Sequence, residues 1–451
     1  MVTDLTNGKP FKLILKFCLP LMAGQLFQQL YNMVDTVIVG KFVGTAELSA
    51  VGSTGSLLFL IIGFVVGMCT GLSIPVSQAF GERNYKKMRR YFINSVYLAV
   101  LISIFLTVVT LAFIKQVLRV MNTPDSIYDL AYSYISIIFG GITATLFYNL
   151  FSCVMRALGD SKTPLFLLIF SSLLNIILDL LFVIKLNMSV RGVAIATVIA
   201  QALSALLALY AIIKKFGILL PQKGEFLPSL DMCGRLLYIG VPMALQISVT
   251  AVGSIMLQSA VNKLGEDVIA AVTVGGKTQL MLVMPSETIG ITMATYCGQN
   301  LGARKIERIN EGVKNSIVMA MVYSVFSFTV GHFFGSELAL LFVPSTQTAV
   351  IEYVGQYLRT CSWFYPFLSM LFIFRNAIQG LGYSVPAMLA GAFELVARAV
   401  MGFVVIPVYG FSAVCFANQS AWLAAFIFLV PTYLIVHSIV KKKIEQGTVK
   451  I

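Results

Sequence analysis

An uncharged stretch at residues 48–81 reads LSAVGSTGSLLFLIIGFVVGMCTGLSIPVSQAFG. A helix needs about 20 apolar residues to cross the hydrocarbon core of a bilayer, so this stretch is long enough to span a membrane. Comparable apolar runs recur along the chain, at residues 17–34, 91–114, 130–155, 163–184, 192–213, 236–262, 268–303, 315–336, 353–374 and 385–440. Pro407 and Gly410 divide the last run into two helices. The pattern predicts an all-α integral membrane protein of about twelve transmembrane helices.

The composition excludes most soluble classes of protein. Of the 451 residues, 58% are hydrophobic and 11% are charged, whereas a soluble protein has about 25% charged residues. The net charge of +13 does not indicate a nucleic-acid-binding protein, because the basic residues form short clusters between apolar runs. Such clusters are typical of the positive-inside rule. We therefore expect the lipid bilayer as a partner and no nucleic acid.

The clusters also predict an orientation. If the helices alternate in direction, most of the 32 basic residues fall on one side of the membrane. This side holds the N-terminus, the loop with Arg83 and Arg90, the connection that contains Lys223, the loop with Arg304, the residue Arg375 and the C-terminal lysines. Basic loops remain in the cytoplasm. We expect a multi-pass protein of the cell membrane with both termini in the cytoplasm.

The two halves of the chain share motifs at positions about 220 residues apart. AFGER at residues 79–83 is matched by NLGAR at 300–304, and RALGDS at 156–161 is matched by QGLGYS at 379–384. The repeat predicts an N-lobe at residues 1–215, a cytoplasmic linker at 216–232 and a C-lobe at 233–451. Because each repeat contains an even number of helices, the lobes are expected to be related by a pseudo-two-fold axis along the membrane normal, with a cavity at their interface.

Ionisable residues inside the membrane are costly and mark functional sites. In the N-terminal half these are Asp35 and Asp179. Asn175 lies four residues before Asp179 and therefore shares its helix face. A single intramembrane aspartate is also compatible with a structural role, but two acids without a basic partner in the same half favour a site for a proton or a hard cation such as Na⁺.

The C-terminal half contains Glu287 and Glu394 in its apolar runs. Glu394 and Arg398 are four residues apart, so they form either a structural ion pair or a contact for the substrate. Glu287 has no such neighbour, and Lys277 lies ten residues away, so Glu287 is the stronger candidate to meet a cationic ligand.

Several motifs together resemble the MATE (multidrug and toxic compound extrusion) transporters of prokaryotes. They are LPL at residues 19–21, DTVIVG at 35–40, RALGD at 156–160, NIILD at 175–179 and GQNLGA at 298–303. The resemblance implies twelve helices in two six-helix lobes. It also implies that Asp35, Asn175, Asp179 and Thr197 correspond to the cation site of the DinF-like branch, with Na⁺ as one candidate ion.

The resemblance assigns further residues. Tyr134 and Asn149 match polar residues beside the cation site, and Pro20 matches a proline at which the first helix bends in some members. One departure concerns the C-terminal half. The run at 236–262 lacks the acidic residue that the NorM-like branch places in its seventh helix, so a second cation site of that type is not expected.

The sequence thus predicts an antiporter that exports small organic compounds, cationic or amphipathic, including drugs, while H⁺ or Na⁺ moves inward. The alternative is a flippase of lipid-linked precursors, but such a protein needs several basic residues in its cavity, and the N-terminal spans offer none. We expect no enzyme activity, because no nucleophile and base stand together. We also expect no ATP site, no cofactor other than the coupling ion, and a monomer.

Overall fold

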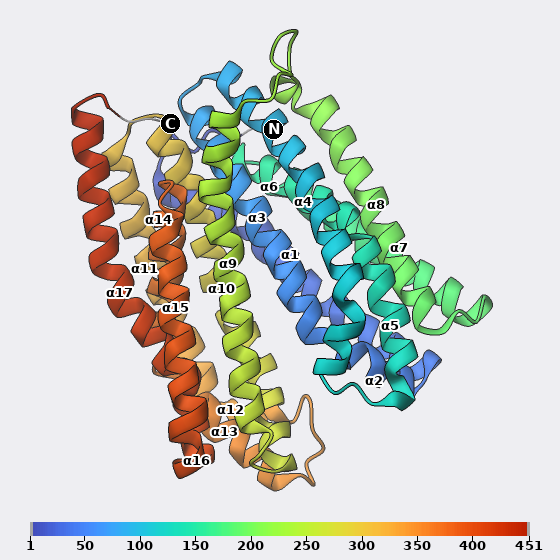
Figure 1. Cartoon of the computed structure of the whole chain (residues 1–451). Coiled ribbons are helices and arrows are strands. Elements are labelled where there is room, and N and C mark those ends of the chain that lie inside the picture. Colours follow the sequence, from blue (N-terminus) through green and yellow to red (C-terminus); the bar gives the residue numbers. More distant parts are fainter. Residues whose placement is uncertain (1–2, 449–451) are drawn as a thin grey trace. The chain divides into compact units, whose positions relative to one another are not determined.

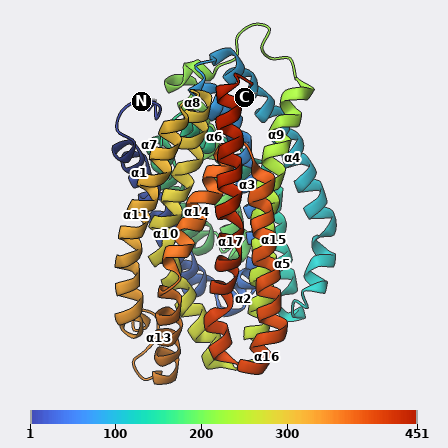
Figure 2. The ribbon, with the colours of Figure 1, turned by 90° about the vertical axis from the view of Figure 1, so that its left-hand side faces the viewer.

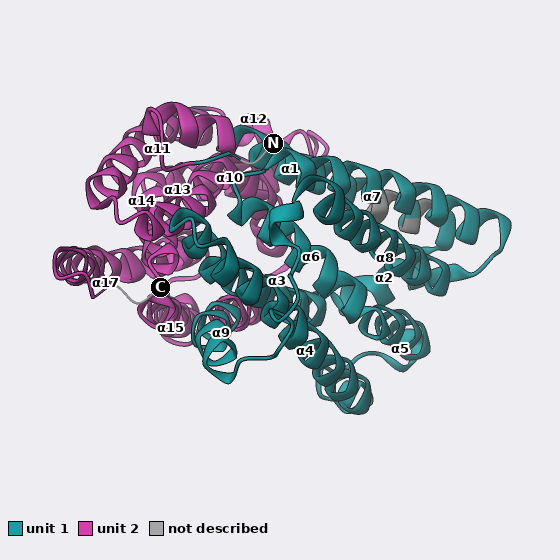
Figure 3. Cartoon of the chain, turned by 90° about the horizontal axis from the view of Figure 1, so that it is seen from above, with its two compact units in different colours: residues 1–4, 19–244 teal, residues 5–18, 245–451 magenta. Residues whose placement is uncertain are grey.

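The structure is a computed structural model that describes residues 3–448, without the side chains of residues 35–37, 39 and 41. The described part of the chain is helical and contains no strand (Figure 1). It divides into two compact units, which Figure 3 colours separately. Unit 1 consists of Met1–Asp4 and Leu19–Ala244, and unit 2 consists of Leu5–Cys18 and Leu245–Ile451.

The helices of the first half, most of which belong to unit 1, follow each other with short connections. They are α1 (Pro10–Ile38), η1 (Val39–Val43), α2 (Thr45–Ser53), α3 (Gly55–Gly81), α4 (Tyr85–Val120), α5 (Asp125–Gly140), α6 (Ile142–Ala157), α7 (Lys162–Leu180), η2 (Leu181–Lys185), α8 (Ser189–Lys215) and η3 (Gly217–Leu219).

The second half has a similar but not identical succession. Its helices are α9 (Leu230–Val261), α10 (Glu266–Gly302), α11 (Ile306–Phe333), α12 (Gly335–Ala339), α13 (Thr348–Ser362), α14 (Tyr365–Gly380), α15 (Ser384–Val400), η4 (Met401–Val405), α16 (Ile406–Tyr409) and α17 (Phe411–Glu445). In unit 2, α14 packs against α10, α11 and α17, and Figure 2 shows these helices running beside one another.

Ten helices in the described residues are long and apolar enough to cross a membrane. An eleventh span is the pair α5 and α6, which bends by 47° at Gly141. The expected fourth span is therefore a broken helix. The expected tenth span is also broken, because α13 ends at Ser362 and α14 begins at Tyr365. The run at 48–81 is likewise two helices, since Thr54 separates α2 from α3.

The internal repeat is visible in the backbone. Arg83 and Arg304, at matched positions of the first motif pair, both adopt a left-handed conformation, with φ of 59° and 58°. Gly159 and Gly382 in the second motif pair have φ of 82° and 87°. Short π-helical segments also occur at matched places, in η2 and η4. The predicted repeat thus extends to the backbone conformation at several helix ends.

Two helices change from one unit to the other along their length. In α1 the boundary falls between Cys18 and Leu19, one residue before Pro20. In α9 it falls between Ala244 and Leu245, two residues after Pro242. A proline inside a helix removes one backbone hydrogen bond and weakens the helix at that turn. The assignment of a hinge to Pro20 stays a prediction, and Pro242 occupies the corresponding place in the second half.

Candidate functional site

Helix α7 presents the two polar residues on which the predicted cation site depends. Asn175 is 2% exposed and Asp179 is fully buried, and both belong to one uninterrupted helix. Four residues make slightly more than one helical turn, so the two side chains lie on one face. This face is buried, although α7 belongs to a strongly apolar span.

Tyr31 contacts Asn175 from another helix, and Thr197 belongs to a helix that packs against α7. The Tyr31 hydroxyl on α1 donates a hydrogen bond to Asn175 Oδ1, whereas Asn175 Nδ2 is buried without a partner among the described residues. Thr197 lies on α8, which packs against α7, and its hydroxyl donates to the Val193 carbonyl oxygen at 3.0 Å. The side chain of Asp35 lies outside the described part of the chain.

Sequence reasoning did not single out Tyr31. A signal was present, because Tyr31 precedes Asp35 by four residues and α1 is helical over both. The other two predicted neighbours lie on the broken span. Tyr134 is buried on α5. Asn149 lies on α6, and its amide nitrogen donates to the Thr145 carbonyl oxygen of the same helix at 2.8 Å.

These side chains carry the kind of oxygen atoms that hard cations bind. Asn175 Oδ1 and Thr197 Oγ1 each accept one more hydrogen bond or one metal contact besides the bonds described above, and Asp179 adds a carboxylate. Na⁺ and Ca²⁺ bind such oxygen ligands. The described residues contain no group of three His, Cys, Asp or Glu side chains that suits a transition metal.

Unit 2 contains a buried cluster of charges. Glu394 on α15 accepts hydrogen bonds from two guanidinium groups, one of Arg375 on α14 and one of Arg398, the latter at 3.3 Å. All three residues are less than a tenth exposed. Arg398 also donates to Asn418 Oδ1 on α17 at 3.2 Å. Glu394 therefore forms an ion pair with Arg398, one of the two roles considered above, and binds a second arginine as well.

The position of Arg375 corrects an expectation. The sequence places Arg375 in a cytoplasmic loop, but the residue lies inside α14, five positions before the helix ends at Gly380. The cluster thus holds two arginines and one glutamate. Glu287 lies on α10 in the same unit and is partly exposed.

Comparison with known proteins identifies the family. The sequence profile of the MatE family matches residues 20–181 and 242–404, one segment in each repeat. The chain belongs to the MatE family. Curated relatives of this MatE chain include the probable multidrug resistance protein YpnP of Bacillus subtilis (strain 168), which is 27% identical over 84% of each chain. Another is the probable multidrug resistance protein NorM of Thermotoga maritima, 24% identical over 88% of this chain and 86% of the relative.

Solved structures agree with the fold. The crystal structure of MATE in complex with MaL6 superposes with a TM-score of 0.90, covers 97% of this chain and 99% of that one, and is 22% identical. The predicted all-α architecture and membership of the MATE transporters are confirmed. The MatE chain is a multi-pass membrane protein.

Proposed function

We propose that this MatE-family protein exports organic compounds, cationic or amphipathic, by antiport against H⁺ or Na⁺. One observation carries the proposal: Asn175 and Asp179 lie fully or almost fully buried on one face of a membrane-spanning helix. A buried carboxylate inside a membrane is expensive and is retained where it has a function. The names of the relatives, which are multidrug resistance proteins, support an organic substrate.

The coupling follows from the energetics of a buried acid. Burial disfavours the ionised form of Asp179, and the second acid of the site, Asp35, disfavours it further. A bound proton or Na⁺ removes this penalty and stabilises the conformation in which the site is closed. After the ion leaves, the hydrated, open conformation is favoured. If the ion and the substrate bind in turn to these two conformations, the inward movement of the ion drives the outward movement of the substrate.

The proposal also includes the orientation of the chain in the membrane and the source of energy for export. Both termini face the cytoplasm, so that export runs away from the side with the basic loops. The ion gradient supplies the free energy, and neither ATP nor an organic cofactor takes part. The protein acts as a monomer without enzyme activity. Asp35, Asn175, Asp179 and Thr197 hold the coupling ion.

Transport into inverted vesicles tests the proposal. A fluorescent organic cation is offered while a pH gradient or a Na⁺ gradient is imposed separately. Asp179→Asn and Asp35→Asn are each expected to abolish uptake, because the amide retains the shape but does not exchange a proton or provide a negative charge. Asp129→Asn is the matched control, since Asp129 is exposed on α5.

The expected result is gradient-driven uptake in the wild type and in Asp129→Asn, and none in the two site variants at equal expression. Uptake at the wild-type rate by both site variants contradicts the coupling role. Uptake by the wild type without any dependence on either gradient contradicts antiport.

A further inference from the structure

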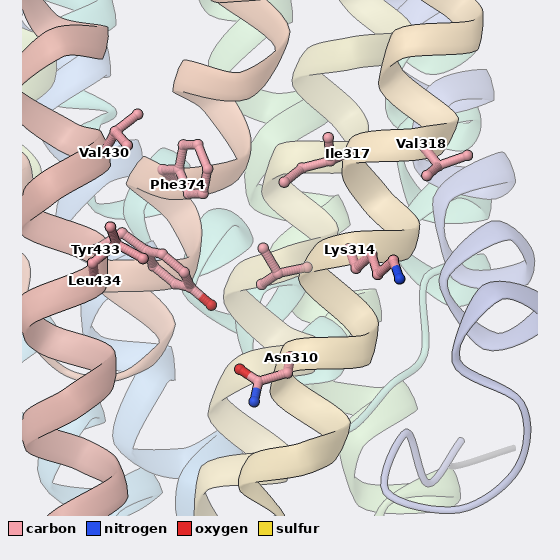
Figure 4. Close-up of a pocket in the computed structure, with 9 residues that line it drawn as sticks. Asn310, Lys314, Ile317, Val318, Phe374, Val430, Tyr433 and Leu434 are labelled. Carbon is pink, nitrogen blue, oxygen red and sulfur yellow. The ribbon is translucent and has the colours of Figure 1, made fainter.

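Unit 2 contains a cavity of about 280 Å³ between helices α11, α14 and α17 (Figure 4). Pockets for drug-sized molecules have volumes of roughly 300–1,000 Å³, so this cavity accommodates only part of a larger molecule. It opens on the outside of the helices, because Val318 and Leu434 in its lining are 52% and 61% exposed. Both side chains belong to membrane-spanning helices, so the opening faces lipid.

The two ends of the cavity differ in polarity. Asn310 and Lys314 lie one turn apart near the start of α11, and Figure 4 shows the Tyr433 hydroxyl pointing toward this helix from α17. Farther along α11 the lining is apolar and includes Ile317 and Val318. Val430 and Phe374 continue the apolar lining from the other two helices. The ring of Phe374 packs against that of Tyr433, with 5.1 Å between the ring centroids.

The positive charge at the polar end has no acidic partner among the described residues. Lys314 is exposed, and the structure pairs it with no acidic side chain in the described residues, its neighbour Glu311 included. Two other basic residues at this end of unit 2 are engaged. Lys305 donates to the Thr6 carbonyl oxygen at 2.9 Å, and Arg308 donates to the Gly8 carbonyl oxygen at 2.9 Å. Lys314 is thus a cation available to a ligand.

This arrangement matches one class of molecule found in a membrane. A phospholipid has a charged phosphate at the interface and an apolar chain that extends into the hydrocarbon core. Basic pockets between helices on the cytoplasmic side bind anionic headgroups, and a lysine on a spanning helix directs its ammonium toward the interface. A zwitterionic choline headgroup adds a second positive charge beside Lys314, whereas an anionic headgroup does not.

We propose that the cavity between α11, α14 and α17 binds one anionic phospholipid, with its phosphate at Lys314, Asn310 and the Tyr433 hydroxyl and one acyl chain along Ile317 and Val318. The site is distinct from the predicted cation site, which lies in unit 1, and the proposal does not depend on which compound is exported. Because the cavity belongs to unit 2 alone, the lipid stabilises this unit.

Native mass spectrometry of the full-length protein tests the proposal, with phosphatidylglycerol and phosphatidylcholine titrated separately. Lys314→Gln removes the charge and Val318→Trp fills the apolar end, and each is expected to weaken binding of the first phosphatidylglycerol by roughly fivefold or more. Lys215→Gln is the matched control, because Lys215 is exposed in the last turn of α8, belongs to unit 1 and does not line the cavity. Thermal unfolding in detergent without added lipid verifies that each variant is folded.

The expected result is tighter binding of phosphatidylglycerol than of phosphatidylcholine in the wild type and in Lys215→Gln, and a loss of this preference in Lys314→Gln. If Lys314→Gln and Lys215→Gln weaken phosphatidylglycerol binding equally, anionic lipid binds around the whole protein without a specific site, and the proposal is wrong. Equal affinity of the wild type for both lipids, reduced only by Val318→Trp, indicates an acyl-chain groove and overturns the anionic preference.

Discussion

Asn175 is bound on one side only. Its amide oxygen accepts a hydrogen bond from the Tyr31 hydroxyl, while its amide nitrogen is buried without a hydrogen-bond partner in the described residues. An orphaned buried donor costs about 1–3 kcal/mol, and such costs are tolerated mainly where a side chain has a function. Na⁺ requires several oxygens held together, whereas a proton requires one carboxylate of raised pKa. Replacing Asn175 therefore tests whether the coupling ion is Na⁺ or a proton.

Na⁺-dependent thermal stabilisation measures this difference. If Na⁺ binds at the proposed site, it stabilises the purified wild type relative to K⁺ by mass action. Asn175→Ala and Thr197→Val each remove one oxygen, so the Na⁺-specific shift in Tm is expected to disappear in both. Thr110→Val is the control, because the Thr110 hydroxyl also donates to a carbonyl oxygen of its own helix, that of Leu106 at 2.7 Å.

A wild type that shows the same Tm in Na⁺ and K⁺ contradicts the Na⁺ site and leaves the proton as the coupling ion. A shift that survives in Asn175→Ala contradicts the role of the amide oxygen. Loss of the shift in Thr110→Val as well indicates that the loss reflects general destabilisation.

The sequence predicts residues that are neighbours on one helix better than residues that meet from different helices. Asn175 with Asp179 and Glu394 with Arg398 follow directly from a spacing of four. The contact of Glu394 with Arg375 joins two helices, and no spacing rule links them. Arg375 was also misplaced because a hydropathy pattern does not fix where a helix ends, and the end of α14 lies five residues beyond it.

At the scale of elements, glycines determine how closely α3 and α9 approach each other in unit 1. A Cβ atom on Gly67 would lie 2.6 Å from the Met243 carbonyl oxygen, and one on Gly71 would overlap the backbone of Gly240. The steps of four between these glycines form the small-residue face that lets membrane helices pack at short distance. Backbone atoms do not move aside as a flexible side chain does.

Gly67→Ala is therefore expected to destabilise the protein by about 1–3 kcal/mol, the usual cost of overpacking. The measurement is the Tm of the purified variant. Gly55→Ala on the same helix is the control, because a Cβ there meets no atom within 4 Å. A Tm for Gly67→Ala equal to that of the control contradicts the close packing of the two helices.

The connection between the halves is fixed to unit 1 by an ion pair. Glu225 is 4% exposed, and Arg89 donates to its two oxygens at 2.6 Å and 2.8 Å. This bidentate contact lowers the pKa of Glu225 from 4.5 to about 2. Because the folded pKa is the lower one, the stabilisation is fully present above pH 4.5 and is lost as the pH falls toward 2.

The rate of cleavage near Glu225 by pepsin, a protease that is active at acidic pH, reports how firmly this ion pair holds the connection. Cleavage of the wild type near Glu225 is expected to be slow at pH 4.5 and to accelerate as the pH falls toward 2. Glu225→Gln lacks the ion pair at every pH, so its cleavage is expected to be fast already at pH 4.5. Glu266→Gln, which changes an exposed acid at the start of α10, is the control. Slow cleavage of Glu225→Gln at pH 4.5 contradicts the role of the pair.

At the scale of the whole molecule, the repeat is the feature that the sequence predicts best. Motif pairs specify the left-handed turns at Arg83 and Arg304, because a helix that ends in this way needs a defined local sequence. The breaks at Gly141 and Trp363 were not predicted, since an apolar run looks the same whether its helix is continuous or bent. The division of α1 and α9 between units depends on contacts between distant segments, which composition does not encode.

The orientation of the whole chain in the membrane is a prediction that labelling from one side tests. The basic loops place Lys223 in the cytoplasm and Glu47 outside. Lys223 is exposed and Glu47 partly exposed, so a cysteine at either position is accessible to a reagent that does not cross the membrane. Cys233 is partly exposed and the other six cysteines are buried. A Cys233→Ala variant is therefore expected to show little labelling of native cysteines. In intact cells the reagent is expected to label Glu47→Cys and not Lys223→Cys, and in inverted vesicles the opposite. The reverse pattern would place the basic loops outside, and it would turn the proposed exporter into an importer.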